Sequence, residues 1–378
     1  MTILSANAGS TSLKFRLLSF PEEKTLSRGS VERIGSVNAA WKFEFEDGRH
    51  TEGVGEIKDY RQGIGLYLDF IKGLEYEAVA FKAVLAKGFD GVCVITDEVL
   101  EGMRETLSVA PAHNSAYISA IEAFRAEAPD KIRIASFETG FHASIPVFRR
   151  VYPVPYEWYS SYGVKRMGYH GASHEGMAQA MHGYKRAISC HLGGSGSICA
   201  ILDGKSVDTS FGLSLQAGLP HVNRCGDIDP YIINYMLSKG LSYEEVMRGL
   251  EVNGGLKGIS GLSGDMRDLR AAAKEGSKRA QLAIDVYVAS IVKYIGAFTA
   301  EMGGLDALGF TGGIGENDFE TRKSVCEGLG FLGIRLDDAK NTACQTRIEA
   351  EGALPVFVIK ANEELTVARK AYKLLKSV

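Results

Sequence analysis

Apolar residues follow two alternating spacings along the first 140 residues of the chain. Short apolar runs predict strands at 2–20, 90–96 and 131–138, and helical spacing predicts helices at 59–74, 97–107 and 114–129. Strands that alternate with helices in this way predict an α/β domain with a layered, largely buried sheet.

The second half of the chain repeats this alternation with longer helices. Helical spacing is found at 174–183, 229–240, 242–252, 265–302, 317–329 and 363–378, and strands are predicted at 305–313 and 354–360. The most apolar stretch begins at Leu282 but carries Asp285 and Lys293. Because a membrane span of about 20 residues rarely tolerates both charges, we expect a buried helix there and no membrane partner.

A glycine-turned hairpin is predicted at the start of each half. An alignment without gaps matches Gly9 with Gly194, Ser10 with Ser195, Ser12 with Ser197, and Leu13 with Ile198. This match predicts two copies of one hairpin, and therefore two similar halves that face each other across a cleft. No Pro-rich or Ser-rich linker separates them, so we expect a short hinge near Thr139.

Composition excludes several classes of protein. A length of 378 residues is about twice the usual domain size, which agrees with two domains. The 43 basic residues are balanced by 46 acidic ones, which argues against a nucleic-acid partner. The six cysteines form no CxxC pair and the N-terminus lacks a secretory pattern, so we expect a reducing compartment, the cytoplasm.

Four glycine-rich turns are candidates for phosphate binding, and each is predicted to follow an apolar strand. They lie at 7–12, 191–197, 261–268 and 310–317. Glycine lets successive backbone N–H groups point into one concavity, which a polyphosphate can fill. One such turn is equally typical of a plain strand connection, but four in one chain favour a nucleotide. Cys199 stands where a P-loop or a Rossmann fingerprint needs glycine, which excludes both motifs.

Clusters of polar residues indicate the chemistry. They lie at 138–142, 168–171, 223–227 and 362–364 and include carboxylates, histidines and an arginine. Carboxylates hold Mg²⁺, and a histidine and an arginine can neutralise a phosphoryl group during transfer. His170 and His174 have the spacing of a zinc pair, but no glutamate follows His170 and we expect Gly171 to interrupt a helix, which disfavours zinc.

These motifs resemble the acetokinase family of the sugar kinase, Hsp70 and actin-like superfamily, along the whole chain. The most specific segments are 7–15 (NAGSTSLKF), 95–99 (ITDEV), 110–114 (APAHN), 138–146 (ETGFHASIP), 155–174, 224–230 (RCGDIDP), 263–268 (SGDMRD), 310–317 (FTGGIGEN) and 362–365 (NEEL). The resemblance implies two duplicated ββαβαβα-type domains around a central cleft. The first, acyl-side domain would comprise residues 1–140 and 363–378, the second, nucleotide-binding domain residues 141–362, and the protein would be a homodimer.

The same resemblance implies reversible phosphoryl transfer from ATP to acetate with Mg²⁺ or Mn²⁺. It assigns catalysis to His170, Arg224, Glu138, Lys82 and His113. It assigns nucleotide and phosphate contacts to Asn7, Ser10, Ser12, Lys14, His191, Gly193, Gly194, Asp265, Met266, Arg267, Gly313, Ile314 and Asn317. Asn7 and Glu363 would hold the metal, and Val84, Ala112, Tyr169 and Leu215 would line the acyl pocket. From its residues alone, His191 is also typical of a structural histidine.

Several positions depart from the family pattern. Lys82 replaces an arginine, Glu138 an aspartate, Gly194 an asparagine, and Ala112 a leucine. Lysine keeps the charge of arginine but loses its planar fork, and a changed pocket wall alters the choice of carboxylate. Three alternatives therefore stay open: a propionate or butyrate kinase, a pyrophosphate-using acyl kinase, or a non-catalytic nucleotide-binding regulator.

Overall fold

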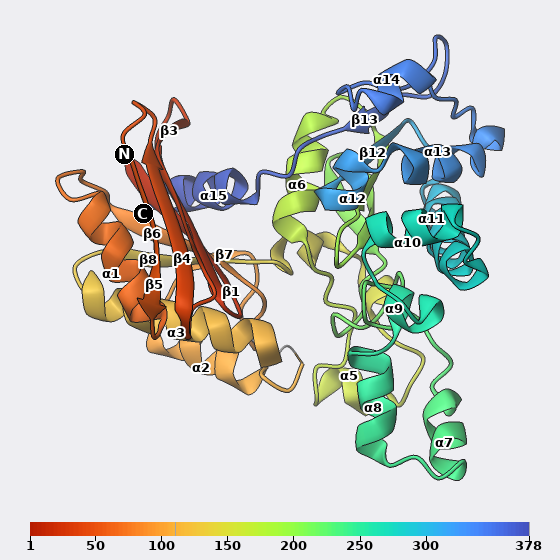
Figure 1. The fold of residues 1–378 in the computed structure, drawn as a ribbon, viewed down its shortest axis with the longest axis horizontal. Coiled ribbons are helices and arrows are strands. Elements are labelled where there is room, and N and C mark those ends of the chain that lie inside the picture. The colour runs from red at the N-terminus through yellow and green to blue at the C-terminus, as the bar shows by residue number, and fades with distance from the viewer. Residues whose placement is uncertain (110, 378) are drawn as a thin grey trace. The chain divides into compact units, whose positions relative to one another are not determined.

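The chain divides by its internal contacts into two compact units (Figure 1). Unit 1 comprises Met1–Ala143 and Asn362–Val378, and unit 2 comprises Ser144–Ala361. The structure, a computed structural model, describes residues 1–109 and 111–377, with the side chains of 111–113 outside the description. Each unit is an α/β domain built on its own mixed sheet.

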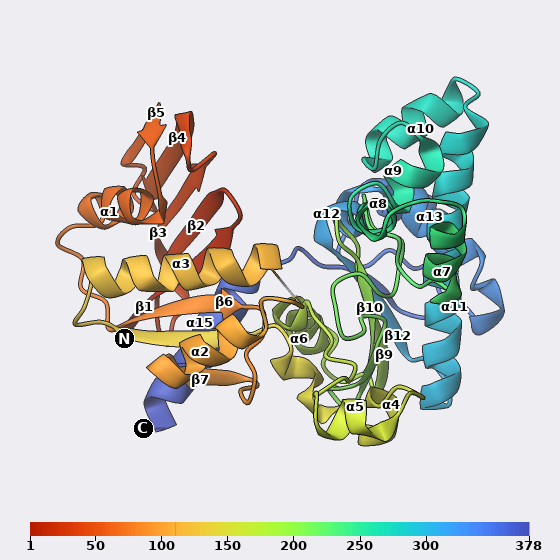
Figure 2. The ribbon, with the colours of Figure 1, turned by 90° about the horizontal axis from the view of Figure 1, so that it is seen from below.

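Unit 1 is built on an eight-stranded sheet of order β5-β4-β3-β2-β1-β6-β8-β7. Its strands are β1 (Thr2–Gly9), β2 (Ser12–Ser19), β3 (Lys24–Glu32), β4 (Ser36–Phe45), β5 (His50–Ile57), β6 (Ala78–Ala83), β7 (Val92–Val94) and β8 (Ile132–Phe137). Its helices are α1 (Tyr60–Phe70), α2 (Asp97–Glu105), α3 (Pro111–Glu127), the 3₁₀ turn η1 (Gly140–Ser144), which ends in unit 2, and α15 (Glu363–Ser377). Helices α1 and α3 cover one face of the sheet and α15 covers the other (Figure 2).

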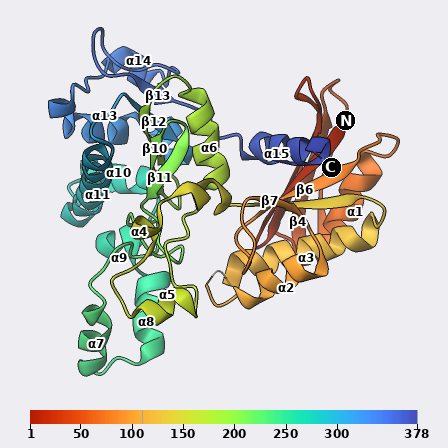
Figure 3. The same cartoon turned by 180° about the vertical axis from the view of Figure 1, so that it is seen from behind.

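Unit 2 is built on a five-stranded sheet of order β11-β10-β9-β12-β13. Its strands are β9 (Arg186–His191), β10 (Ser197–Leu202), β11 (Lys205–Thr209), β12 (Ala307–Thr311) and β13 (Val356–Val358). Its helices are α4 (Val147–Arg150), α5 (Tyr156–Ser160), α6 (Gly171–Ala180), α7 (Tyr231–Ser238), α8 (Tyr243–Glu251), α9 (Gly255–Ser260), α10 (Met266–Lys274), α11 (Lys278–Met302), α12 (Gly312–Asn317), α13 (Phe319–Glu327), η2 (Gly330–Leu332) and α14 (Asp338–Thr342). Helices α6 and α11 lie on opposite faces of this sheet (Figure 3).

The two sheets share one topology, which confirms the predicted duplication. In each sheet, three antiparallel strands are followed by two strands that run parallel to β1 in unit 1 and to β9 in unit 2. The orders are β3-β2-β1-β6-β8 in unit 1 and β11-β10-β9-β12-β13 in unit 2. The ungapped alignment is nevertheless wrong at Gly9. Gly9 pairs with Ser12 across a two-residue turn, whereas His191 pairs with Ser197 across five residues. The structural counterpart of Gly9 is therefore His191, because the second loop is three residues longer.

Three sequence-based expectations about unit 2 need correction. The predicted helix at 265–302 is two helices, α10 and α11, because Gly276 takes a left-handed conformation and Ser277 caps the second helix. The turn at 261–268 follows α9 and not a strand. Gly171 does not interrupt a helix but begins α6, since a first-turn residue needs little helix propensity and His170 before it is left-handed.

Helix α11 matches the apolar stretch that was predicted to form a buried helix. In the part of the chain that the structure describes, it is the one helix long and apolar enough to cross a membrane by length and composition. Its residues Ile284, Tyr287, Ile291 and Ile295 are buried in the core of unit 2, whereas Leu282 is 52% exposed. The helix is thus buried along one face, as expected of an amphipathic helix packed on a sheet.

Candidate active site

The parallel strands of unit 1 bring four of the predicted site residues to one edge of its sheet. Lys82 lies near the end of β6, Glu138 directly follows β8, and Asn7 lies on β1 beside the end of β6. Glu363 is the first residue of α15. The carboxyl ends of parallel strands meet at one edge of a sheet. Asn7 and Glu138 therefore lie at the same edge although they are more than 130 residues apart in the sequence.

Lys82 and Glu363 form an ion pair that is largely shielded from water. Nζ of Lys82 donates to Oε2 of Glu363 at 2.7 Å, and the two side chains are 19% and 16% exposed. Burial alone would lower the pKa of Lys82, but the carboxylates of Glu363 and Glu138 raise it well above its usual value. The lysine is therefore charged at every physiological pH.

Asn7 is oriented by a tyrosine that the sequence analysis did not single out. The hydroxyl of Tyr117, on α3, donates to Oδ1 of Asn7 at 2.6 Å, and burial raises the pKa of Tyr117. This bond uses the amide oxygen and directs the amide NH₂ of Asn7 elsewhere. The predicted phosphate contacts Ser10, Ser12 and Lys14 lie in or beside the β1–β2 turn, with Ser10 and Lys14 exposed.

The donors at this edge fit a hard divalent cation. Glu138, Glu363 and Asn7 supply carboxylate and amide oxygens, which are the ligands that Mg²⁺ prefers. In the described part of the chain, no group of three or more His, Cys, Asp and Glu residues is arranged to hold a metal ion. Mg²⁺ does not need such a group, because one or two carboxylates can bind the ion while substrate phosphates and water fill the rest of its coordination shell.

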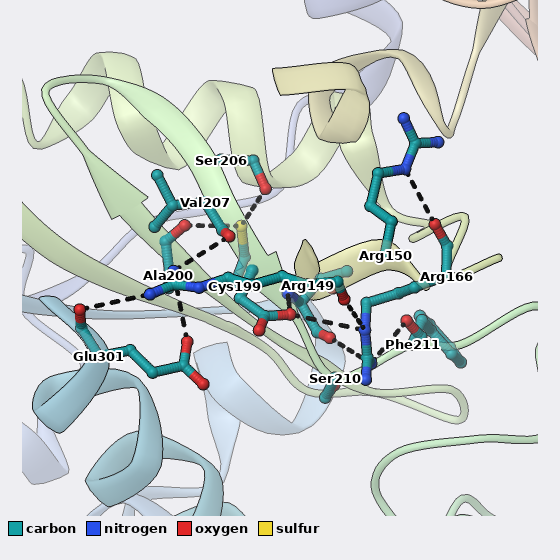
Figure 4. A network of polar contacts seen from close by, with 12 residues as sticks. Arg149, Arg150, Arg166, Cys199, Ala200, Ser206, Val207, Ser210, Phe211 and Glu301 are labelled. Carbon is teal, nitrogen blue, oxygen red and sulfur yellow. Dashed lines mark hydrogen bonds and ion pairs between the residues drawn. The ribbon is translucent and has the colours of Figure 1, made fainter. Parts of the chain in front are cut away.

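In unit 2, a network of arginine contacts fixes the segment that leads to His170 (Figure 4). Nη1 of Arg166 donates to the carbonyls of Thr209 and Phe211 at 2.8 and 3.3 Å, and Nε of Arg150 donates to the carbonyl of Arg166. Tyr169 is buried, and its hydroxyl donates to the carbonyl of Leu213 at 2.6 Å. His170 thus emerges from a segment with little freedom to move.

His170 packs against a second predicted residue, His191. The two rings are stacked with their centroids 4.0 Å apart, and Nδ1 of His191 is hydrogen-bonded to Oγ of Ser173 at 2.8 Å. His170 takes a left-handed backbone conformation, with φ of 59°, where α6 begins. Non-glycine residues adopt this conformation rarely, and such residues concentrate at functional sites.

Arg224 is a cation without a carboxylate partner. Its side chain forms no ion pair among the residues that the structure describes, and burial lowers its pKa. Its carbonyl accepts a hydrogen bond from the backbone of His221, whose Nδ1 accepts from the N–H of Gly196 in the β9–β10 loop. A partly buried cation without a counter-ion is a favourable place for an anion.

One pocket of unit 2, of about 680 Å³, is lined by most of the predicted nucleotide contacts. Those that line it are Gly193, Gly194, Asp265, Met266, Arg267, Gly313, Ile314 and Asn317. They come from the β9–β10 loop, the start of α10 and helix α12. Asp265 caps α10, and its bond with the side chain of Arg267 lowers the pKa of Asp265 to about 2.

Other residues line the same pocket but were not predicted from the sequence. They are Val222, Gly264, Arg270, Asp318, Phe319 and Glu320. Nε of Arg270 donates to both carboxylate oxygens of Asp318, at 3.1 and 3.0 Å, and this pair joins α10 to the start of α13. The partners are 48 positions apart, so no local pattern indicates the contact.

The four residues predicted to line an acyl pocket are divided between the units. Val84 and Ala112 belong to unit 1, whereas Tyr169 and Leu215 belong to unit 2. The side chains of Ala112 and His113, and Ala110 of the APAHN motif, lie outside the described residues. Their predicted roles stay predictions.

Comparison with known proteins decides the family. The Acetokinase family profile matches residues 2–369. The chain belongs to the acetokinase family. An acetate kinase of Shouchella clausii is 42% identical over 98% of this chain and 99% of its own length, and a propionate kinase of Citrobacter rodentium is 38% identical over 98% and 96%. The crystal structure of a propionate kinase from Francisella tularensis has a TM-score of 0.91 at 33% identity and covers 98% of each chain.

Membership of the acetokinase family confirms the resemblance, the two-domain α/β fold and the prediction of a kinase enzyme. The family match extends through both units, so both carry parts of an acetokinase.

Proposed function

We propose that this protein transfers the γ-phosphoryl group of ATP reversibly to acetate, giving acetyl phosphate and ADP. The observation that carries the proposal is the pocket of unit 2, lined by the glycine-rich turns, with the unpaired cation Arg224 two residues after its lining residue Val222. The family match and the relatives named acetate kinase support this reading. The nucleotide would lie in that pocket, with Gly313 and Asn317 near its phosphates.

The reaction needs no enzyme base and no covalent intermediate. An acetate oxygen attacks the γ-phosphorus in line, the bond from that phosphorus to the bridging oxygen breaks, and ADP leaves with the electron pair. Acetate is already ionised at neutral pH, so no proton has to be removed. The chain's own residues would therefore position the reactants and neutralise charge on the phosphoryl group.

His170 and Arg224 would be the groups that neutralise this charge. Arg224 would form bidentate hydrogen bonds to phosphoryl oxygens, and His170 would donate from its imidazole. Asn7 would contact the transferred group, and Glu363 and Glu138 would hold Mg²⁺. When bound, that ion supplies electrostatic screening of the phosphates.

The direct test is to trap acyl phosphate as the hydroxamate with purified protein, Mg²⁺ and ATP, using acetate, propionate and butyrate in parallel. Product with acetate is expected, and absence of product with all three acids would refute the proposal. The relative named propionate kinase and the small residue Ala112 favour propionate as a second substrate. A kcat/KM for propionate about a thousandfold below that for acetate would dismiss it.

The role of Arg224 has its own test. Arg224→Ala should lower kcat by about 10³-fold, as for other arginines that stabilise a transferred phosphoryl group, with little change in ATP affinity. Arg248, exposed on α8, provides the matched control, since Arg248→Ala removes the same charge from unit 2 outside the site. A near-normal kcat for Arg224→Ala would remove this residue from the mechanism.

A further inference from the structure

We propose that Ser197 is a positioning residue that holds His170 at Nδ1 and couples the protonation of His170 to that of His174 through one hydroxyl group. The inference rests on the proposed function only for the catalytic role of His170. Oγ of Ser197 lies 2.8 Å from Nδ1 of His170 and 2.8 Å from Nε2 of His174. Nδ1 of His174 lies 2.8 Å from Oγ of Ser189. The four side chains form one continuous hydrogen-bonded chain within unit 2.

Three of the four side chains are shielded from water, whereas His170 is partly exposed. Ser197, His174 and Ser189 are each 0% exposed. The two serines lie on the paired strands β10 and β9, and the two histidines lie at the start of α6, one turn apart. Because Ser197, His174 and Ser189 are fully buried, the bonds among these three side chains cannot be exchanged for bonds to solvent.

Because a hydroxyl has one proton to donate, Ser197 can donate to only one of the two histidines, which gives two arrangements of the chain. In the first state, His170 carries hydrogen on Nδ1 and donates to Ser197, which donates to His174, which donates from Nδ1 to Ser189. In the second state every bond is reversed, and His170 accepts at Nδ1 while its hydrogen is on Nε2. Without the hydroxyl of Ser197, Nδ1 of His170 would no longer be linked to Nε2 of His174, and the tautomer of His170 would no longer depend on the hydrogen bonds of His174.

The first state is the one that allows His170 to be a cation. An imidazolium carries hydrogen on both nitrogens, so its Nδ1–H must donate to Ser197 while Nε2–H, on the opposite edge of the ring, donates to a phosphoryl oxygen. The second state leaves the ring neutral but still a donor at Nε2. In either state Ser197 is bonded to Nδ1, so the edge of the ring that carries Nε2 is left for the phosphoryl group. Ser197 would thus orient a catalytic group without contacting the substrate itself.

The rings around His170 complete its surroundings. His191 stacks on one face at 4.0 Å, the ring of Phe211 meets it at 5.2 Å in an edge-on arrangement, and His174 lies at 6.3 Å. None of these contacts can fix a tautomer, because stacked and edge-on rings do not distinguish Nδ1 from Nε2 by a directed hydrogen bond. Ser197, which is bonded to Nδ1 of His170, is the group that couples this tautomer to the hydrogen bonds of His174.

The test compares Ser197→Ala with Ser206→Ala. Ser206 is also 0% exposed and lies on the adjacent strand β11, where its hydroxyl contacts Sγ of Cys199. Ser197→Ala should lower kcat roughly 10- to 100-fold, the usual effect of removing an orienting partner, with KM for ATP within about threefold of wild type. Ser206→Ala should keep the wild-type kcat. A normal kcat for Ser197→Ala would overturn the inference.

A second readout does not depend on turnover. Nitrogen-15 spectra of the histidine side chains, with the His170 signals assigned from their loss in His170→Asn, report the tautomer directly. Ser197→Ala should change the Nδ1 and Nε2 shifts of His170, and Ser206→Ala should not. If Ser197→Ala fails to fold, Ser197→Cys preserves the volume and weakens the bond, and should change the same signals. Unchanged His170 signals would overturn the inference even in a protein without kinase activity, whereas changed signals without acyl phosphate formation would contradict only the proposed function.

Discussion

At the scale of single residues, the pairing of Lys82 with Glu363 bears on one of the positions where the sequence is expected to depart from the family pattern. At a position where the resemblance implies an arginine, a lysine bonds a carboxylate that is predicted to hold the metal. A compact ammonium between Glu363 and Glu138 neutralises part of their charge. The substitution therefore balances two acids without the planar fork that could also grip a substrate anion.

Removal of this cation should be costly. Lys82→Met leaves two carboxylates close together in a poorly hydrated place, and loss of one partner of a buried pair destabilises proteins by about 3 kcal/mol or more. The matched control is Lys87→Met, since the pair of Lys87 with Glu105 is 71% and 46% exposed and such pairs contribute about 1 kcal/mol at most. Urea unfolding of both variants measures the difference, and equal losses would show that the Lys82 pair is not effectively buried.

His221 predicts how stability depends on pH. Burial and the charge of Arg224 lower its pKa to about 3, whereas an unfolded histidine titrates near 6.5. Protons therefore bind the unfolded chain preferentially between these values, and stability falls as pH drops. Between pH 7 and pH 5 this group alone should cost about 2 kcal/mol.

The measurement is the difference in unfolding free energy between pH 7 and pH 5. His221→Asn, which keeps an oxygen to accept from the N–H of Gly196, should lose less stability on acidification than wild type does. His50→Asn changes an exposed histidine of unit 1 and should show the wild-type loss. An acid sensitivity in His221→Asn as large as in wild type would contradict the assignment.

At the scale of elements, the sequence predicts what depends on local pattern and misses what depends on tertiary contacts. The glycine-rich turns were found at 191–197 and 310–317 because their chemistry is local. Strand β5 was missed because almost all of its side chains are exposed or partly exposed, so it has no alternating apolar face. The pair of Arg270 with Asp318, and the hydroxyl of Ser197 between two histidines, arise only from folding. The three-residue difference between the hairpin loops likewise follows from strand register.

Helix α12 depends on close backbone contact at its first residue. Gly312 has φ of 80°, and a Cβ there would lie 2.6 Å from the carbonyl oxygen of Leu192, which itself accepts from the N–H groups of Ile314 and Gly315. Gly312→Ala should push α12 away from the β9–β10 loop and weaken ADP binding by about tenfold or more, measured by calorimetry.

The control for Gly312→Ala is Gly276→Ala, between α10 and α11. Gly276 has φ of 96° but nothing lies within 4 Å of the position of a Cβ, so the variant has similar backbone strain without the collision. Both variants should lose stability, and only Gly312→Ala should lose ADP affinity. Equal affinities in the two variants would show that the packing of α12 on Leu192 does not shape the pocket.

At the scale of the whole molecule, the chain passes from unit 2 into unit 1 between Ala361 and Asn362. Each side of this junction is tied to its own unit. Oε1 of Glu316, on α12, accepts from the N–H groups of Gly312 and Ala361 at 3.0 and 2.9 Å, and Oδ1 of Asn362 accepts from Nη1 of Arg16 at 2.5 Å. The residue after Asn362 is Glu363, the predicted metal ligand. A single carboxylate thus links the glycine-rich turn that lines the pocket of unit 2 to the segment that precedes Glu363.

This link predicts that binding of a nucleotide to unit 2 changes the hydrogen exchange of the junction between Ala361 and Asn362. Binding of ADP should order α12 and slow hydrogen exchange in a peptide that contains Ala361, because both amides share the oxygen of Glu316. In Glu316→Ala that protection should be lost, while protection of the pocket segment at 264–270 persists. Glu316→Gln retains an amide oxygen that can accept both bonds and should behave like wild type. If ADP protected Ala361 equally in Glu316→Ala, the coupling would have to run through the strand β13 that precedes the junction, since that strand is hydrogen-bonded to β12, the strand that leads into α12.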